Sequence, residues 1–127
     1  MQDNIDNKSY LLEGNCQYQI VCFTKKAEKT ISKQDKNLIL LKFNTFVHDE
    51  PLVIVYDVQI TPNYIYIDMK ADPSVNMHAF VGSLKKSIKT ENVTWDKQYY
   101  ISTVPIKNTD IMKFMKRLET PNLNKKI

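Results

Sequence analysis

Two tyrosines at alternate positions, Tyr64 and Tyr66, are the residues whose spacing points most directly to chemistry. On a β-strand, residues i and i+2 share a face, so both phenol rings would lie side by side on one surface of a sheet. Such a pair can stack on nucleic-acid bases, at about 1–3 kcal/mol for each stacked base. The alternative is aromatic packing against whatever covers that face of the sheet, and the residue types favour it.

Two sets of lysines could supply phosphate contacts beside such a surface. They could equally be solvated surface, because lysine is frequent along the whole chain: all but one of the 18 basic residues are lysines, the exception being Arg117. The first set is Lys25, Lys26 and Lys29, and the second is Lys85, Lys86 and Lys89.

The sequence carries no recognisable metal or nucleophile motif. His48 and His78 belong to different elements and have no Cys, Asp or Glu at ligand spacing, so we predict neither a metal site nor a cofactor. Neither histidine has the flanking residues of a Ser-His-Asp or Cys-His site. Gly14 and Gly82 are the only glycines, which excludes a glycine-rich phosphate loop.

Length and composition are those of one globular domain, which we expect to span residues 1–127 with flexible ends at 1–15 and 120–127. The net charge of +4 admits a polyanionic partner without requiring one. No apolar run approaches the roughly 20 residues that cross a bilayer, and no signal peptide is visible, so we expect a cytoplasmic protein without a membrane partner. Cys16 and Cys22 are expected to be reduced.

Hydrophobic periodicity predicts the elements that must position these residues. Apolar residues alternate in four segments, and two longer segments have apolar stripes at helical spacing. A third, short helix follows the last strand. The predicted strands are 16–23, 52–60, 64–70 and 98–104; the predicted helices are 33–47, about 73–88 and 110–119; residues 90–97, with Trp95, are predicted as a loop.

This order of elements is typical of an α+β fold, the ferredoxin-like split βαβ arrangement. We therefore predict an antiparallel four-stranded sheet with two helices on one face. The C-terminal helix is left for the other face of the sheet or for a partner. Its broad apolar surface, from Ile111 to Leu118, favours burial against more than one surface.

In this order, the segments resemble the single-tyrosine HUH transposases of bacterial insertion sequences and their relatives associated with palindromic repeats. The first segment, YQIVCFTKK, is similar to the family's opening strand, commonly YHIVFVTKYR, and TWDKQYYISTV is similar to LWGKGYFVSTVG. The resemblance covers residues 16 to 119 in the family's order and spacing. Its five segments are residues 18–26, 60–67, 81–88, 94–104 and 111–118.

The resemblance implies a catalytic site that this chain has lost. In the family, a His-x-His pair and a Gln of the last helix bind a divalent metal that polarises the scissile phosphate, and a Tyr of that helix attacks it. Here the histidine positions are Tyr64 and Tyr66, the nucleophile position is Phe114 and the Gln position is Leu118. Phe114 has no hydroxyl with which to form a covalent link to DNA, and neutral phenols are poor ligands for Mg²⁺.

We therefore expect a catalytically inactive transposase relative, a homodimer retained for binding single-stranded or hairpin DNA, with RNA as the other polyanion to consider. The first alternative is an active transposase with a non-standard nucleophile, Tyr64, Tyr99 or Tyr100. The second is a structural or interaction protein that does not bind nucleic acid.

Overall fold

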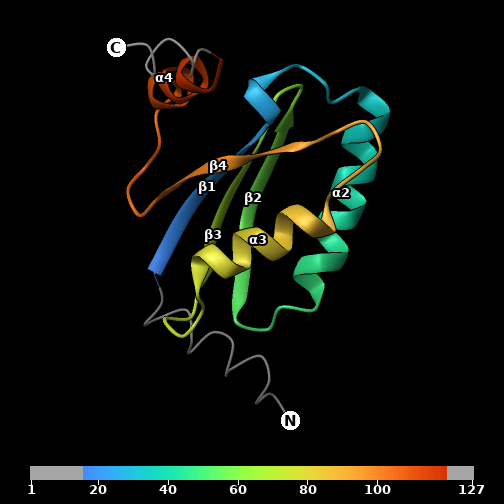
Figure 1. The fold of residues 1–127 in the computed structure, drawn as a ribbon. Helices are drawn as coiled ribbons and strands as arrows, with labels where there is room; N and C mark the ends of the chain where they lie inside the picture. Colours follow the sequence, from blue (N-terminus) through green and yellow to red (C-terminus); the bar gives the residue numbers. More distant parts are fainter. Residues whose placement is uncertain (1–15, 120–127) are drawn as a thin grey trace.

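The computed structural model describes residues 16–119; the ends expected to be flexible, 1–15 and 120–127, lie outside them. Four strands, three α-helices and one 3₁₀ turn follow one another in the predicted order (Figure 1). They are β1 (Cys16–Thr24), η1 (Lys25–Ala27), α2 (Lys33–His48), β2 (Val53–Thr61), β3 (Tyr64–Ala71), α3 (Met77–Ser87), β4 (Trp95–Ser102) and α4 (Asn108–Glu119).

The strands form one antiparallel sheet in the order β2-β3-β1-β4, which confirms the predicted ferredoxin-like arrangement. The hairpin of β2 and β3 turns through Pro62 and Asn63, and the Thr61 hydroxyl donates to the Asn63 side chain at 3.1 Å. A proline and an asparagine suit this turn, because proline presets φ and asparagine bonds locally. β1 lies in the middle and pairs with both β3 and β4, while β2 and β4 form the two edges.

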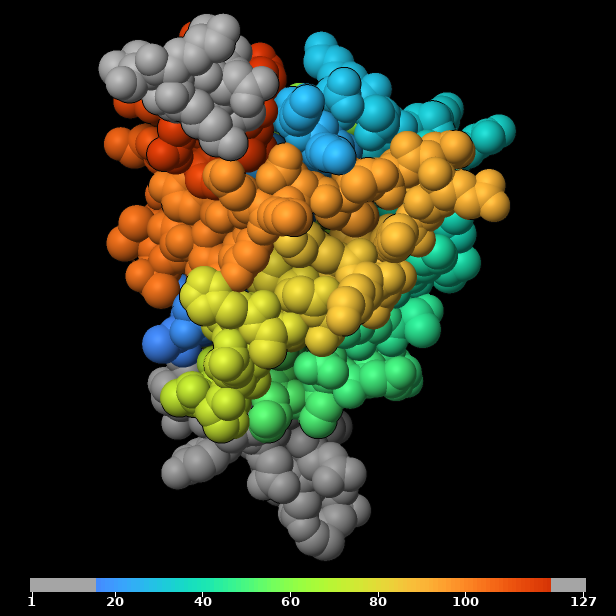
Figure 2. Space-filling view, viewed as in Figure 1, coloured from blue at the N-terminus to red at the C-terminus, as the bar shows by residue number. Residues whose placement is uncertain are grey.

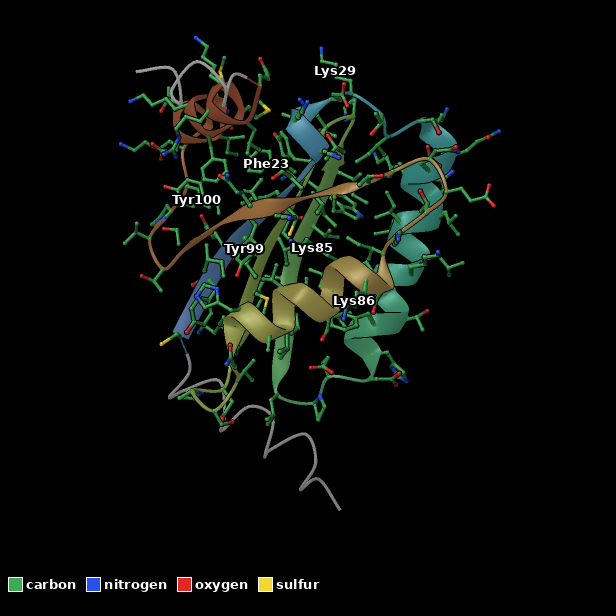
Figure 3. All side chains as sticks on the ribbon, in the orientation of Figure 1. Phe23, Lys29, Lys85, Lys86, Tyr99 and Tyr100 are labelled. Carbon is green, nitrogen blue, oxygen red and sulfur yellow. The ribbon has the colours of Figure 1, made fainter. Side chains whose placement is uncertain are left out.

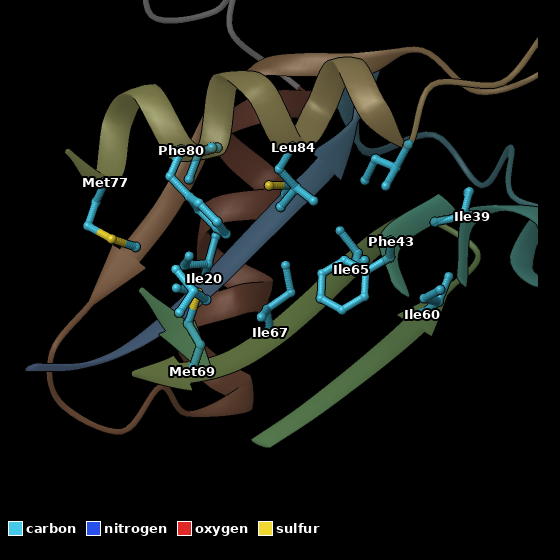
Figure 4. Close-up of a cluster of buried hydrophobic side chains, with 14 of the residues drawn as sticks. Ile20, Ile39, Phe43, Ile60, Ile65, Ile67, Met69, Met77, Phe80 and Leu84 are labelled. Atoms are coloured by element: carbon cyan, nitrogen blue, oxygen red, sulfur yellow. The ribbon is translucent and has the colours of Figure 1, made fainter. Parts of the chain in front are cut away.

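The larger core lies between the sheet and helices α2 and α3, on what we call the helical face (Figure 4). α2 begins in a capping box: the Asp35 amide donates to the Ser32 hydroxyl at 3.1 Å, and the Asp35 carboxylate accepts from the Ser32 amide at 3.2 Å. These bonds satisfy N–H groups that a helix start leaves without partners. The fully buried side chains on this face include Ile20, Ile39, Phe43, Ile65, Ile67, Met69, Leu84 and Ile88.

The opposite side of the sheet, which we call the α4 face, holds a second, smaller core. Val21, Phe23 and Ala27 pack there with Ile111 and Leu118 of α4. The last helix therefore covers one end of this face of its own sheet, where Figure 1 shows it in red beside η1. This is the first of the two positions that the sequence left open.

Two predicted boundaries are wrong. Trp95 was expected in a loop, yet it begins β4 and pairs with Thr24, because the strand starts earlier and ends at Ser102. Helix α3 begins at Met77 and not near Pro73, because the Asp72 carboxylate accepts from the Ser74 amide at 2.9 Å and closes a turn of its own. No helix within residues 16–119 is long and apolar enough to cross a membrane.

Candidate nucleic-acid interface

The α4 face brings together the four positions that correspond to the family's catalytic residues. Tyr64 and Tyr66 project from β3, and Phe114 and Leu118 from α4, and all four belong to the same apolar cluster. Leu118 is buried at 4% exposure, whereas the two tyrosines and Phe114 are half-buried. Alternation puts the two tyrosines on one face of β3, i, i+4 spacing puts the other two residues on one side of α4, and the docking of α4 on the sheet brings the two pairs together.

Phe114 is the centre of an aromatic stack. Its ring lies parallel to that of Phe23, with ring centroids 5.1 Å apart and an interplanar angle of 6°, and it stacks on Tyr100 at 5.6 Å. The guanidinium of Arg117 lies 4.9 Å from the Phe114 centroid, and the Tyr64 ring meets Phe23 edge-on at 6.0 Å. Aromatic side chains thus fill the space between α4 and the sheet.

The side chains at these positions do not suit a divalent metal, which the fold family would imply. Burial, followed by the nearby charges of Asp68 and Asp57, raises the pKa of Tyr66, so this phenol is neutral at neutral pH. The carboxylate on β3, that of Asp68, accepts a hydrogen bond from the side-chain Nε2 of Gln17 at 2.9 Å. Among residues 16–119 there is no group of three or more His, Cys, Asp or Glu side chains that could hold a metal ion.

Beside this cluster, the short turn η1 has a strained backbone. Lys26 and Ala27 adopt φ values of 55° and 57°, in the left-handed region that residues other than glycine rarely occupy. Surrounding groups fix this conformation: the Lys26 amide donates to the Asp96 carboxylate at 2.9 Å, and the Lys25 amide donates to the Thr94 carbonyl at 2.8 Å. Strain of this kind, about 1–3 kcal/mol for each residue, is concentrated at functional sites in proteins.

A hollow of about 360 Å³ lies where η1, the start of β4 and the last turn of α4 meet. Figure 2 shows the blue η1 segment and the red α4 together above the orange β4. Three lysines line the hollow with one carboxylate, that of Asp96, whose oxygens already accept from two backbone amides. The lining residues are Lys25, Lys26, Thr94, Trp95, Asp96, Lys97, Gln98 and Leu118.

The structure separates the two predicted lysine sets. Lys25 and Lys26 line the hollow and Lys29 is exposed in the same loop, whereas Lys86 and Lys89 are exposed at α3; Figure 3 shows Lys29 and Lys86 at different ends of the molecule. Lys85 is engaged internally (Figure 3): its ammonium donates to the carbonyls of Asp96 and Lys97 at 3.0 and 3.2 Å and lies 5.1 Å from the centroid of the Tyr99 ring.

Sequence reasoning missed Lys97, which joins Lys25 and Lys26 around the hollow. The signal was weak, because residues 90–97 were expected to form a loop with no fixed relation to η1. Residues 94–104 resemble one of the transposase segments, and this resemblance was the one hint that the stretch around Lys97 is part of the sheet.

The alternative nucleophiles lie on two sides of the sheet. Tyr64 and Tyr100 belong to the α4 face, whereas Tyr99 packs on the helical face, where its hydroxyl contacts Nδ1 of His78. Within residues 16–119, no group of three or more His, Cys, Asp or Glu side chains that could hold a metal ion lies beside any of the three tyrosines. Their surroundings are those of packed aromatic residues.

The solved structures that match this architecture include two transposases. A protein from Deinococcus radiodurans R1 assigned as a transposase superposes with a TM-score of 0.65 and 13% identity, over 83% of this chain and 89% of its own. A REP-associated tyrosine transposase bound to a REP hairpin gives a TM-score of 0.58 and 7% identity, over 86% of this chain and 67% of its own. The chain has the fold of these transposases. Neither a protein-family model nor a curated protein sequence matches it.

Proposed function

We propose that the chain is a non-catalytic relative of the tyrosine transposases that binds hairpin or single-stranded DNA in the cytoplasm. The observation that carries the proposal is the stacking of Phe114 on Phe23 and on Tyr100 in the transposase-like fold, next to the lysines that line the hollow. The fold supplies a surface of the type that nucleic-acid enzymes use, and packed aromatic side chains stand where those enzymes have metal ligands and a nucleophile.

The absence of catalysis follows from the residues on the α4 face. A phosphotyrosine link needs a hydroxyl nucleophile, and the phenylalanine at position 114 has none. A metal that polarises phosphate needs oxygen or nitrogen ligands, yet Leu118 offers neither and the pKa of Tyr66 is raised. Tyr64 is turned to packing by its edge-on contact with Phe23.

Nucleic-acid binding is supported by charge and by the structural neighbour. Within residues 16–119, the ammonium groups of Lys25, Lys26 and Lys97 have no hydrogen-bonding or ion-pairing partner, so they are available to phosphates. The REP-associated tyrosine transposase that shares this fold is bound to a REP hairpin. The second lysine set is a weaker candidate, because Lys85 is already bonded to two carbonyls.

The test is a salt titration of binding to a DNA hairpin with a single-stranded tail. Exchange of Lys25 and Lys29 for Gln should weaken binding and reduce the slope of log Kd against log salt by about 1.4–1.8, because each lost phosphate contact accounts for about 0.7–0.9. The matched control exchanges two other exposed lysines for Gln, Lys86 on α3 and Lys89 just after its end, and should leave the slope unchanged. An RNA hairpin of the same sequence separates a DNA ligand from an RNA ligand.

If the protein binds no hairpin at low salt, the interaction-protein alternative replaces this proposal. Equal effects of the two double variants would show that binding is spread over both lysine sets, which contradicts an interface at the η1 end.

A second experiment addresses catalysis. Phe114→Tyr alone should give no covalent protein–DNA adduct in Mg²⁺ or Mn²⁺, because the metal ligands are still missing; Tyr64→His, Tyr66→His and Leu118→Gln are needed with it. An adduct formed by the unchanged protein, resolved on a denaturing gel, would contradict the proposal.

We also propose a homodimer, since β2 and β4 leave two sheet edges without a partner within the described residues; sedimentation at micromolar concentration measures the oligomeric state.

A further inference from the structure

We propose that the hollow between η1, β4 and α4 is a binding site for one unpaired nucleotide, with its base inserted and its phosphate on the lysines. The inference rests on the proposed nucleic-acid binding and adds a specific place and ligand class to it. Its elements are the volume of the hollow, the chemistry of its walls and the fixed backbone of η1.

The volume selects a single nucleotide over a duplex. Pockets that hold small organic ligands measure about 300–1,000 Å³, and the hollow, at about 360 Å³, is at the lower end of that range. A paired base cannot leave its stack to enter it without unpairing. An unpaired base in a loop, a bulge or a single-stranded tail can, at a smaller cost.

The walls combine the two chemistries of a nucleotide. Trp95 and Leu118 provide apolar surface for a base, while Lys25, Lys26 and Lys97 provide cations for the phosphate. The indole N–H of Trp95 is buried and has no acceptor among the described residues, so Trp95 contributes the surface of its ring and not a hydrogen bond. An inorganic anion would use the lysines alone, whereas a nucleotide would use both halves of the site.

Backbone hydrogen bonds of η1 fix the main chain of Lys25 and Lys26 at the hollow before any ligand arrives. Lys26 and the residue after it keep positive φ values because the turn is hydrogen-bonded to the start of β4: the Lys26 amide donates to the Asp96 carboxylate, and the amide before it donates to the Thr94 carbonyl. Asp96 accepts from the amides of Lys26 and Gln98, at 2.9 and 3.0 Å, so its charge is already engaged by N–H groups. A rigid turn loses little freedom on binding, which favours affinity.

Trp95 is the only tryptophan of the chain, and it lines the hollow, so its fluorescence reports occupancy directly. The probes are a dT hexamer and an abasic hexamer with the same number of phosphates, each labelled for anisotropy. We expect the dT hexamer to bind roughly ten-fold more tightly than the abasic one and to quench the Trp95 emission, because base stacking adds to the phosphate contacts. The abasic hexamer should bind weakly with little quenching.

The variant Thr94→Phe places a ring at the hollow, from an exposed position whose backbone bond to Lys25 is kept. It should reduce the affinity for the dT hexamer about ten-fold, to that of the abasic hexamer. The matched control, Thr103→Phe, adds the same ring at an exposed threonine outside the hollow and should change neither affinity nor quenching.

The outcomes separate this inference from the function on which it rests. If the dT hexamer binds by anisotropy but leaves the Trp95 emission unchanged, or binds no better than the abasic hexamer, the nucleotide site is refuted while nucleic-acid binding stands. If neither hexamer nor the tailed hairpin binds, both proposals fail. The unmodified protein decides these cases, so the inference does not depend on whether Thr94→Phe folds.

Discussion

The two sides of strand β3 have opposite characters. On the helical face, Ile65, Ile67 and Met69 are completely buried, whereas Tyr64, Tyr66 and Asp68 on the α4 face are half-buried. The ionisable groups on the two sides reflect this. Burial raises the pKa of the Cys22 thiol, on the helical face, to about 12, while the pKa of Tyr66 is raised by partial burial and by neighbouring carboxylates.

The difference teaches which side holds the fold together and which side is open to change. The helical face is a closed apolar core between a sheet and two helices, so substitutions there disturb packing throughout. The α4 face is covered at one end by a single helix, and its aromatic residues lie beside cations. A surface of this second type can exchange metal ligands for packing residues without loss of the fold.

The largest expected effect tests the helical face. Phe43→Ala should lower the free energy of unfolding by about 3–5 kcal/mol, because Phe43 is 1% exposed and its removal leaves a cavity in the main core. Urea unfolding followed by circular dichroism measures the loss. Leu41→Ala on the same helix is the control: its side chain is 64% exposed, so the change should stay within about 0.5 kcal/mol.

The second prediction measures the α4 face on the same scale. Phe114→Ala should cost about 1–2 kcal/mol, since a half-buried ring loses its stacking on Phe23 and Tyr100. Met112→Ala, at an exposed position of the same helix, should be close to neutral. A loss as large as that of Phe43→Ala would erase the distinction between the two faces.

A smaller effect comes from the start of α2. Ser32→Ala removes the hydroxyl that accepts from the Asp35 amide and should destabilise the protein by about 1 kcal/mol. The Ser32 hydroxyl and amide also lower the pKa of Asp35, so the stability due to this carboxylate is present above its ordinary pKa of 3.8 and is lost as the pH falls through the lowered value. The difference between wild type and variant should therefore narrow on acidification, measured by urea unfolding at several pH values.

The smallest expected change is a gain. Gly82 lies inside α3, and a Cβ there would meet no heavy atom within 4 Å. Gly82→Ala should raise the free energy of unfolding by about 0.5–1 kcal/mol through helix propensity. Ala79→Gly, an exposed position of the same helix, is the reverse control and should lower stability by a similar amount. A lower free energy of unfolding for Gly82→Ala would contradict the prediction, because it would mean that an added Cβ disturbs the packing at this position.

The fold could be predicted from the sequence because its signals are periodic. Alternation placed Tyr64 and Tyr66 on one face of β3, Ser32 marked the start of α2, and the order of elements gave the sheet. Local patterns determined these features, so no knowledge of distant contacts was needed. The spacing of Phe114 and Leu118 likewise put them on one side of α4, but the docking of that helix on this sheet, which brings the four family positions together, was left open by the sequence.

The basic hollow could not be predicted, because it depends on contacts between residues far apart in the chain. Lys26 has positive φ without the glycine that usually marks such a position, and the bond that holds it comes from Asp96. Lys97 was expected in a loop, because the residues around it show no clear alternation of apolar and polar side chains. Its place in β4 becomes visible only in the pairing of β4 with β1. The two lysine sets looked equivalent in sequence, and only the fold distinguishes them.

The central place of β1 also governs the order in which the chain can assemble. The β2–β3 hairpin joins neighbouring segments, whereas the pair of Val21 and Tyr100 joins the first strand of the chain to the last. Contacts between distant segments form late, since closing a long loop costs entropy. While a ribosome is still making α3, β1 therefore has one bare edge, and the strand that will close it does not yet exist. During that interval an extended peptide could pair with the bare edge of β1, and this topology does not protect the newly made chain from such pairing.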